Sequence, residues 1–219
     1  MLKMDSHIHS EYSPDSHSKI DDILKVAKNK KIDIIAISDH NTIDGTSEVL
    51  RKTRNTDILA IPSIEISSTQ GHILGFGCEE NIPKGLSPAE TIDKIHDLAG
   101  LAIIPHPYCF YRHGLLCESE NENLKIDAIE TKNARFIIGY CNRKAKKLSI
   151  KKSLPALGAS DSHYWKFVGD CYSLINCEKD IDSVLKAIAK GNVEAHGKGT
   201  SNILLSKYLF EKNVLMKLK

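Results

Sequence analysis

One run of apolar residues constrains the fold of this chain more than any other feature. Residues 32–37 read Ile-Asp-Ile-Ile-Ala-Ile, an almost uninterrupted apolar stretch. A strand with one solvated face alternates apolar and polar residues, whereas a parallel strand that is covered on both faces does not. Parallel neighbours need a crossover connection, usually a helix. The run therefore predicts an α/β fold with a buried parallel sheet.

Strand and helix patterns alternate along the rest of the chain. We expect further strands at 4–10, 58–66, 71–77, 101–104, 126–130, 154–159 and 172–177. We expect helices at 20–31, 47–54, 88–99, 134–149, 180–190 and about 202–217. No Pro/Gly-rich linker interrupts this order, so the pattern predicts one domain over residues 1–219, with the last helix packed on it. A single closed α/β barrel is favoured, and an open parallel sheet is the alternative.

Composition excludes some classes of protein. The 219 residues are 41% hydrophobic and 26% charged, which is typical of a globular protein. The formal net charge of +2 does not argue for a dedicated nucleic-acid surface, although it leaves room for a local basic patch. The six cysteines show no C-x-x-C spacing, and neither a signal peptide nor a membrane span is evident. We expect a soluble cytoplasmic protein without an obligate protein partner.

The first expected strand contains the sequence His7-Ile8-His9. Side chains two residues apart lie on the same face of a strand, so both imidazoles can point into one pocket. Two adjacent imidazoles are half of a metal site, and the remaining ligands must come from elsewhere in the chain. Alone, this motif also suits a pair of hydrogen-bonded histidines, so its meaning depends on the other strands.

Further candidate ligands stand at or just after the ends of the expected strands. In α/β barrels the reactive groups lie at this carboxyl-terminal rim. The candidates are His7, His9, Asp15, His40, Glu65, His72, His106, Asp161 and His163. Burying so many titratable groups without cations would be costly, so their convergence predicts metal binding. We expect structural or surface roles for His17, His96 and His196, and we leave His113 undecided.

Nine ligands exceed what one ion can use, because a site that keeps a water takes only three to five protein groups. The set therefore predicts two or three divalent transition-metal ions. Two adjacent ions usually share a carboxylate, and Glu65 is the candidate for that bridge. Imidazole and carboxylate without thiolate suit zinc, manganese or iron(II), and the sequence does not choose among them.

As a set, these motifs resemble the PHP (polymerase and histidinol phosphatase) superfamily of metal-dependent phosphoesterases. The resemblance spans Met1 to about Gly197. It is carried by Asp5-Ser6-His7-Ile8-His9, Ser13-Pro14-Asp15-Ser16, Ser38-Asp39-His40-Asn41-Thr42, Glu65, His72 in His-Ile-Leu-Gly, His106 in Pro-His-Pro, and Ser160-Asp161-Ser162-His163. It implies a distorted seven-stranded (β/α) barrel with a trinuclear site at the carboxyl rim.

The resemblance also implies an assignment of ligands to three ions. The first ion would be held by His7, His9, Glu65 and Asp161, the second by Glu65, His72 and His106, and the third by Asp15, His40 and His163. Glu65, Asp161 and His163 are the predicted catalytic residues. A hydroxide between two ions would attack the phosphate ester, and water on the third ion, in preference to His163 or His40, would protonate the leaving group.

The expected substrate is a small phosphorylated molecule, such as a nucleotide or a short RNA or DNA end. Arg112 and Asn133 are the candidate substrate-binding residues, since both lie after strands that end at the rim. The guanidinium of an arginine can also bind a phosphate through two parallel hydrogen bonds. A histidinol-phosphate phosphatase is an alternative, but such relatives resemble longer chains. An RNA-binding subunit of the ribonuclease P type is an alternative of another class, and it would be expected to lack the ligands and to be more basic.

Overall fold

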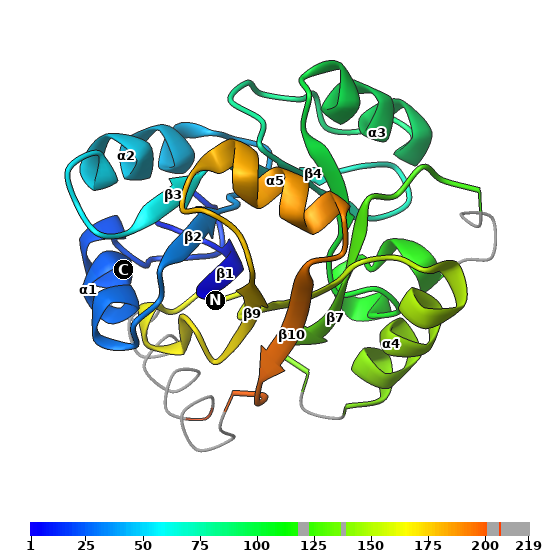
Figure 1. Cartoon of the computed structure of the whole chain (residues 1–219). Coiled ribbons are helices and arrows are strands. Elements are labelled where there is room, and N and C mark those ends of the chain that lie inside the picture. The colour runs from blue at the N-terminus through cyan, green and yellow to red at the C-terminus, as the bar shows by residue number, and fades with distance from the viewer. Residues whose placement is uncertain (118–122, 137–138, 201–205, 207–219) are drawn as a thin grey trace.

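The computed structural model describes residues 1–117, 123–136, 139–200 and 206. Its strands form two five-stranded sheets, with helices on their outer faces (Figure 1). The first sheet has the order β10-β9-β1-β2-β3, built from Val193–Gly197, Cys171–Ile175, Leu2–Ile8, Ile34–Ile37 and Leu59–Ile61. The second has the order β4-β5-β6-β7-β8, built from Ser63–Ser67, His72–Phe76, Leu101–Ile104, Ala128–Asn133 and Ala156–Ala159. The predicted α/β class is confirmed.

The two sheets are not a closed seven-stranded barrel within the described residues, so that expectation is not borne out. β1, β2 and β3 are parallel, as are β6, β7 and β8, but β5 runs antiparallel to both β4 and β6. The connection between β4 and β5 is the short segment 68–71, which is too short for a helical crossover. A hairpin therefore replaces a strand–helix unit at this point.

The expected strand 58–66 is also wrong in one respect. It is divided at Pro62 into β3 and β4, which belong to different sheets. Proline has no N–H to donate to a ladder, so a sheet ends readily there. The division carries the chain from the first sheet to the second and places Glu65 at the junction, where Glu65 N donates to Asp39 O over 3.1 Å.

The helices cover the sheets as their apolar faces require. The outer face of the first sheet packs on α1 (Ile20–Asn29) and α2 (Asp44–Thr53), and that of the second on α3 (Pro88–Asp97) and α4 (Tyr140–Lys152). The inner faces of both sheets share one core with α5 (Ile181–Ala189), including Met4, Phe76 and Ile188. α4 begins six residues later than predicted, and β10 was not predicted. The expected helix at 202–217 lies outside the described residues, apart from Ser206.

The two sheets meet again at the carboxyl ends of β1 and β8. His9 N donates to Ser162 O over 2.9 Å, and Ile8 pairs with Ser162 in an isolated parallel bridge. A second isolated bridge pairs His40, just beyond β2, with Glu65 in β4. These junctions bring residues from four distant segments to one rim. Among the described residues, no helix combines the length and apolar character needed to cross a membrane.

Candidate metal centre

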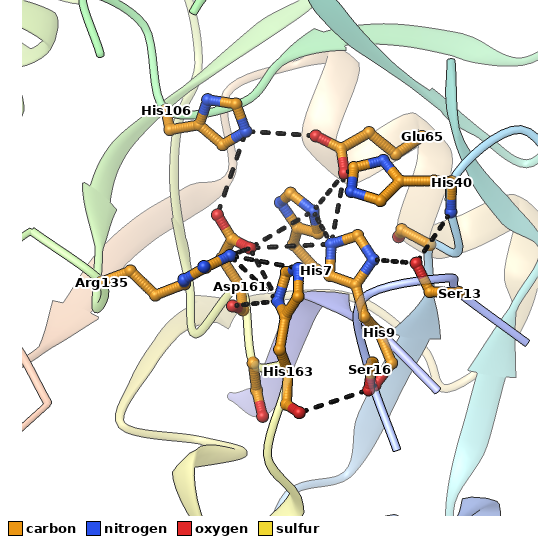
Figure 2. Close-up of polar contacts among 12 residues, drawn as sticks. His7, His9, Ser13, Ser16, His40, Glu65, His106, Arg135, Asp161 and His163 are labelled. Carbon is orange, nitrogen blue, oxygen red and sulfur yellow. Dashed lines mark hydrogen bonds and ion pairs between the residues drawn. The ribbon is translucent and has the colours of Figure 1, made fainter. Parts of the chain in front are cut away.

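The nine candidate ligands converge at this rim, as the strand ends predicted. His7 and His9 come from the end of β1 and the residue after it, Glu65 from β4, and His72 from the start of β5. The others lie in the loops that follow β1, β2, β6 and β8; they are Asp15, His40, His106, Asp161 and His163. Figure 2 shows that side chains from these separate elements point toward one another.

Glu65 is the centre of the arrangement. Five imidazole nitrogens lie 3.0–3.3 Å from its two carboxylate oxygens, those of His7, His9, His40, His72 and His106. Oε2 faces the first three residues and Oε1 faces the last two. Each oxygen therefore has its own group of nitrogen atoms, which is the arrangement that a carboxylate shared by two cations requires.

A second part of the site lies beside this group. Asp15 Oδ2 is 2.8 Å from His163 Nε2 and 3.6 Å from His40 Nε2. Asp161 Oδ1 is 3.6 Å from His9 Nε2 and Asp161 Oδ2 is 3.9 Å from His106 Nε2. Asp161 thus lies between His9 and His106, on the opposite side of the imidazoles from Asp15.

The donor atoms form three overlapping sets in which all ligand atoms lie within 4.8 Å of one another. The sets are His7, His9 and Glu65; His40, Glu65 and His72; and His9, Asp15, His40 and His163. They overlap the three groups that the family resemblance implied, although His9, His40 and Glu65 each belong to two sets and His106 and Asp161 to none. The assignment of each residue to one ion stays a prediction.

Two of these residues have a backbone conformation that is unusual for their type. His106 has φ +31° and Asp161 has φ +50°, in the left-handed region of backbone conformation that residues other than glycine rarely adopt. Such a conformation is maintained only where the surrounding structure fixes it, and it is concentrated at functional sites. Here it turns the chain sharply after β6 and β8, so that both side chains point back into the rim.

Glu130 is part of the site, although the sequence did not identify it. Glu130 lies in β7 and is fully buried, and its Oε1 accepts a hydrogen bond from His7 Nδ1 over 2.8 Å. Its Oε2 accepts from His106 N and from Asn133 Nδ2, each over 2.9 Å. A carboxylate on the far nitrogen of an imidazole fixes the ring and its tautomer, which leaves Nε2 of His7 free to bind a cation. Its position at the end of an expected strand was the available clue.

Arg112 and Asn133, the predicted substrate-binding residues, also reach the rim. Arg112 pairs with Asp161 and donates to Asn133 Oδ1 over 3.2 Å, and Asn133 Nδ2 donates to Asp161 Oδ2 over 2.9 Å. Arg135 adds a second guanidinium, with Nη1 3.3 Å from Asp161 Oδ1. Arg112 and Arg135 border a cavity of about 430 Å³ whose lining also includes His40, His72, His106, His113 and His163, whereas Asn133 is fully buried and does not line it. The cavity is large enough for a small phosphate ester.

Burial and neighbouring charges set different proton affinities within the histidine pair. Burial lowers the pKa of His9 to about 3. Burial also acts to lower the pKa of His7, but the charges of Glu65 and Glu130 outweigh it and raise that pKa to about 9. The two Nε2 atoms are 2.9 Å apart, so protonated His7 can donate to neutral His9. A proton on His7 Nε2 competes with a cation for the same lone pair, so cation binding at His7 requires loss of that proton.

The donor set fits divalent cations. The Nδ1 atoms of His40 and His72 are buried and have no hydrogen-bond partner among the described residues, although each lies within about 3 Å of a Glu65 oxygen. Buried polar atoms normally have a partner, and an atom that serves as a metal ligand is one kind of exception. Imidazole and carboxylate atoms that face one another without hydrogen-bond geometry are what a metal site offers.

Two family models match the chain. The model described as PHP domain matches residues 5–154, which are 150 of the 219 residues. The chain belongs to the PHP domain family. A second model, described as PHP-associated, matches residues 139–193 and contains Asp161 and His163. The family resemblance seen in the sequence is thereby confirmed, and the PHP match covers the other seven candidate ligands.

Similar proteins agree with this membership. The uncharacterized protein MJ1587 of Methanocaldococcus jannaschii is 40% identical over 164 residues, which cover 69% of this chain and 93% of that protein. The structure of PsfC from Pseudomonas syringae PB-5123 is 14% identical and has a TM-score of 0.72 over 98% of both chains. A two-domain protein of Bacteroides vulgatus ATCC 8482 containing a predicted PHP-like metal-dependent phosphoesterase is 16% identical, with a TM-score of 0.71. The match covers 90% of this chain and 65% of that one, and at such identities it shows the PHP fold alone.

Proposed function

We propose that this PHP protein is a metal-dependent phosphoesterase that hydrolyses small phosphate esters such as nucleotides, short oligonucleotides or other phosphomonoesters. The observation that carries the proposal is the position of Glu65, whose two oxygens each face a separate group of imidazole nitrogens. A shared carboxylate of this kind suits a site of two or three ions. Zinc, manganese and iron(II) all match the donor set.

The residues would divide the work as follows. Glu65 would be shared between two ions, with His7, His9 and Asp161 as the further ligands of one and His72 and His106 as those of the other. Asp15, His40 and His163 would hold a third. Bound ions supply Lewis acidity toward the phosphoryl oxygens and a nucleophile that is active at neutral pH.

Substrate positioning falls to the polar groups at the edge of the cavity. Arg112 and Arg135 approach Asp161 from the cavity side, where two guanidinium forks can bind the oxygens of an anionic ester. Asn133 holds Arg112 and Asp161 at a fixed separation, because its amide contacts both. Burial and the nearby Arg135 lower the pKa of Arg112 to about 10, so the side chain still carries its charge at neutral pH.

A ribonuclease P type scaffold is less well supported, because it would not need nine converging ligands.

The test of the phosphoesterase proposal is to purify the protein in metal-replete medium, determine its metal content, and measure phosphate release with added manganese. The substrates are p-nitrophenyl phosphate, nucleotides, nucleoside bisphosphates, sugar phosphates and histidinol phosphate. We expect two or three ions per chain and turnover of at least one ester. Less than one ion per chain, or no release from any ester, would overturn the proposal.

A further inference from the structure

Helix α4 carries an unusual concentration of positive charge. Its thirteen residues include six lysine or arginine side chains and no aspartate or glutamate, in a protein with a net charge of only +2. All six are exposed, whereas the apolar Ala145 and Leu148 are turned toward the sheet. We call these six residues the basic face of α4; they are Arg143, Lys144, Lys146, Lys147, Lys151 and Lys152.

This charge has a cost within the helix. Like charges three or four residues apart, such as Arg143 with Lys147 and Lys147 with Lys151, repel each other and destabilise a helix. A solvated helix face normally mixes both signs, which avoids this cost. Among the described residues, Arg143, Lys146 and Lys147 form no ion pair, whereas Lys144 lies over the ring of Tyr108. The repulsion is therefore not relieved by the chain itself, and an external anion would relieve it.

A groove lies beside the basic face. Its volume is about 360 Å³, and it separates α4 from β10. Arg143 and Lys146 from the helix and Lys132 from β7 line it, together with apolar Ile150 and Val193. Glu194 also lines the groove, and its carboxylate lies 3.3 Å from His196 Nε2. The groove thus combines three cations and one carboxylate with an apolar wall, and its excess of positive charge suits a ligand that has both a phosphate and a flat, weakly polar group.

Large aromatic side chains are exposed at the first residue of the helix and in the segment that follows β6. Tyr140, Tyr111 and Phe110 are 61%, 72% and 84% exposed. Tyr108 connects this segment to α4, because the Lys144 ammonium lies 4.0 Å from the centroid of its ring. Phe110 lines a different cavity together with the β4–β5 connection, so Tyr140 and Tyr111 are the rings available to a ligand bound along α4. Tyr111 also borders the cavity of the metal centre, so the aromatic group reaches that cavity directly.

Hydrogen bonds fix α4 against the metal centre. The Asn142 side chain accepts from Asn133 N and donates to Asn133 O, both over 3.1 Å. The Asn133 side chain in turn contacts Arg112 and Asp161. Asn142 lines the groove and Arg112 borders the cavity. Asn133 contacts both residues and so connects the groove to the cavity. In addition, Cys141 Sγ lies 3.4 Å from Tyr108 O.

We propose that the basic face of α4, its groove and the exposed aromatic side chains bind a single-stranded nucleic acid whose terminal phosphate enters the metal centre. The inference rests on the proposed function and narrows its substrate to an oligonucleotide end. Cations along a groove follow the phosphate backbone, and aromatic rings stack on unpaired bases. α4 is about 20 Å long, so its basic face contacts several phosphates.

A membrane surface or a duplex fits these observations less well. An interfacial helix needs a continuous apolar face turned outward, whereas Tyr140 and Ile150 are exposed singly at opposite ends of α4, and Ala145 and Leu148 face the protein. A duplex keeps its bases stacked inside and offers none to Tyr111 or Tyr140. Unpaired bases are the group that exposed aromatic rings recognise.

The test compares two triple variants in the full-length protein. R143Q/K146Q/K147Q removes charge from the basic face, and glutamine preserves the helix propensity. K25Q/K28Q/K94Q removes three exposed lysines from α1 and α3 as a matched control. The probe is a fluorescein-labelled twelve-nucleotide RNA or DNA with a terminal phosphate. Its binding is followed by anisotropy at several salt concentrations, without added metal so that it is not cleaved.

We expect the α4 variant to weaken binding about tenfold or more and to reduce the salt slope by about 2, since each lost phosphate contact removes about 0.7. The control should change binding less than about twofold. Equal losses in both variants would overturn the inference, because binding would then follow overall charge. Binding of the wild type to vesicles of phosphatidylglycerol and phosphatidylcholine but not to the oligonucleotide would also overturn it, in favour of a membrane surface.

A second variant tests stacking. Y111A/Y140A should weaken oligonucleotide binding at least about fivefold, since base stacking on an aromatic ring contributes about 1–3 kcal/mol. Unchanged binding would exclude the aromatic contribution. Turnover separates the two proposals. If the wild type hydrolyses p-nitrophenyl phosphate but the α4 variant keeps its preference for an oligonucleotide over this ester, only the inference fails. If no ester is hydrolysed while α4-dependent binding persists, only the hydrolase proposal fails.

Discussion

The metal centre and the basic face of α4 are both incomplete in charge, but in opposite ways. At the metal centre, buried lone pairs from imidazoles and carboxylates converge without enough hydrogens between them. On α4, exposed cations gather without carboxylates. The first arrangement is stabilised by a cation and the second by an anion. Asn133 connects the two regions, because its side chain contacts Asp161 at the metal centre and its backbone contacts Asn142 in α4.

The comparison of the two regions shows that burial determines how much free energy an unpaired charge costs. Buried charges are poorly screened, so a missing partner at the metal centre costs several kcal/mol per group. Exposed charges are screened by salt, so each lysine on α4 contributes little alone and the face acts by summation. Single substitutions should therefore be decisive at the metal centre, whereas only multiple substitutions should matter on α4.

The largest effect is expected for Glu65→Gln. The amide keeps the size of the side chain but removes the charge that two ions would share, and it places an NH2 group against lone pairs. We expect turnover to fall at least about a thousandfold, because metal-ion catalysis supplies several kcal/mol of transition-state stabilisation. Phosphate release and metal content measure it. Glu80→Gln, an exposed carboxylate in the loop after β5, is the control. Wild-type turnover in the Glu65 variant would refute the shared carboxylate.

Metal removal comes next. A ligand present at a hundred times its Kd stabilises the folded state by about 2.7 kcal/mol. For a protein of this size that corresponds to a rise in Tm of about 5–10 °C. Treatment with a chelator should lower Tm by this amount, and added manganese or zinc should restore it. R143Q/K146Q/K147Q should show the same shift as the wild type, because α4 contributes no ligand. An unchanged Tm in the wild type would argue that cations do not complete the site.

Glu130→Gln should have an intermediate effect for a specific reason. Oε2 of Glu130 accepts two hydrogen bonds, from His106 N and Asn133 Nδ2, so the amide oxygen of glutamine must take that position. The amide NH2 then faces His7 Nδ1 and forces the proton of His7 onto Nε2, where the ligand lone pair is needed. We expect metal affinity to fall about 10–100-fold, as is usual for such supporting residues. A metal titration measures it.

The control for this variant is Asp127→Asn, a carboxylate that accepts from Ala102 N and lies outside the site. It should leave metal affinity unchanged. If Glu130→Gln also binds metal as tightly as the wild type, the tautomer of His7 does not depend on Glu130 and the positioning role is wrong.

Much of the site could be predicted from the sequence, because position at a strand end is a local property. His106, Glu65 and Asp161 each follow or end an apolar run, and the crossover rule brings such ends to one edge. Glu130 escaped because its partner His7 is 123 residues away and nothing in its neighbourhood marks it as a hydrogen-bond acceptor. The direction in which each imidazole presents its nitrogen atoms also depends on contacts that no local pattern encodes.

The overall architecture was less predictable for a related reason. Strand existence follows from apolar runs, but sheet assignment depends on where the chain changes direction. Pro62 and the short segment 68–71 divert the chain into a second sheet and an antiparallel hairpin. Both features are visible in the sequence. No local pattern, however, encodes that β4 pairs with β5 rather than with β3.

The smallest effect is expected where a charge already has its partner within the chain. His96 Nε2 lies 2.8 Å from Asp127 Oδ2, and both side chains are about one-third exposed. An exposed pair of this kind contributes about 0–1 kcal/mol. His96→Gln should therefore lower Tm by less than about 4 °C and leave both metal content and oligonucleotide affinity unchanged. Thermal denaturation and a metal assay check this. A loss of metal would mean that His96 serves the distant rim, and the contrast between satisfied and unsatisfied charges would no longer separate structural from functional histidines in this PHP protein.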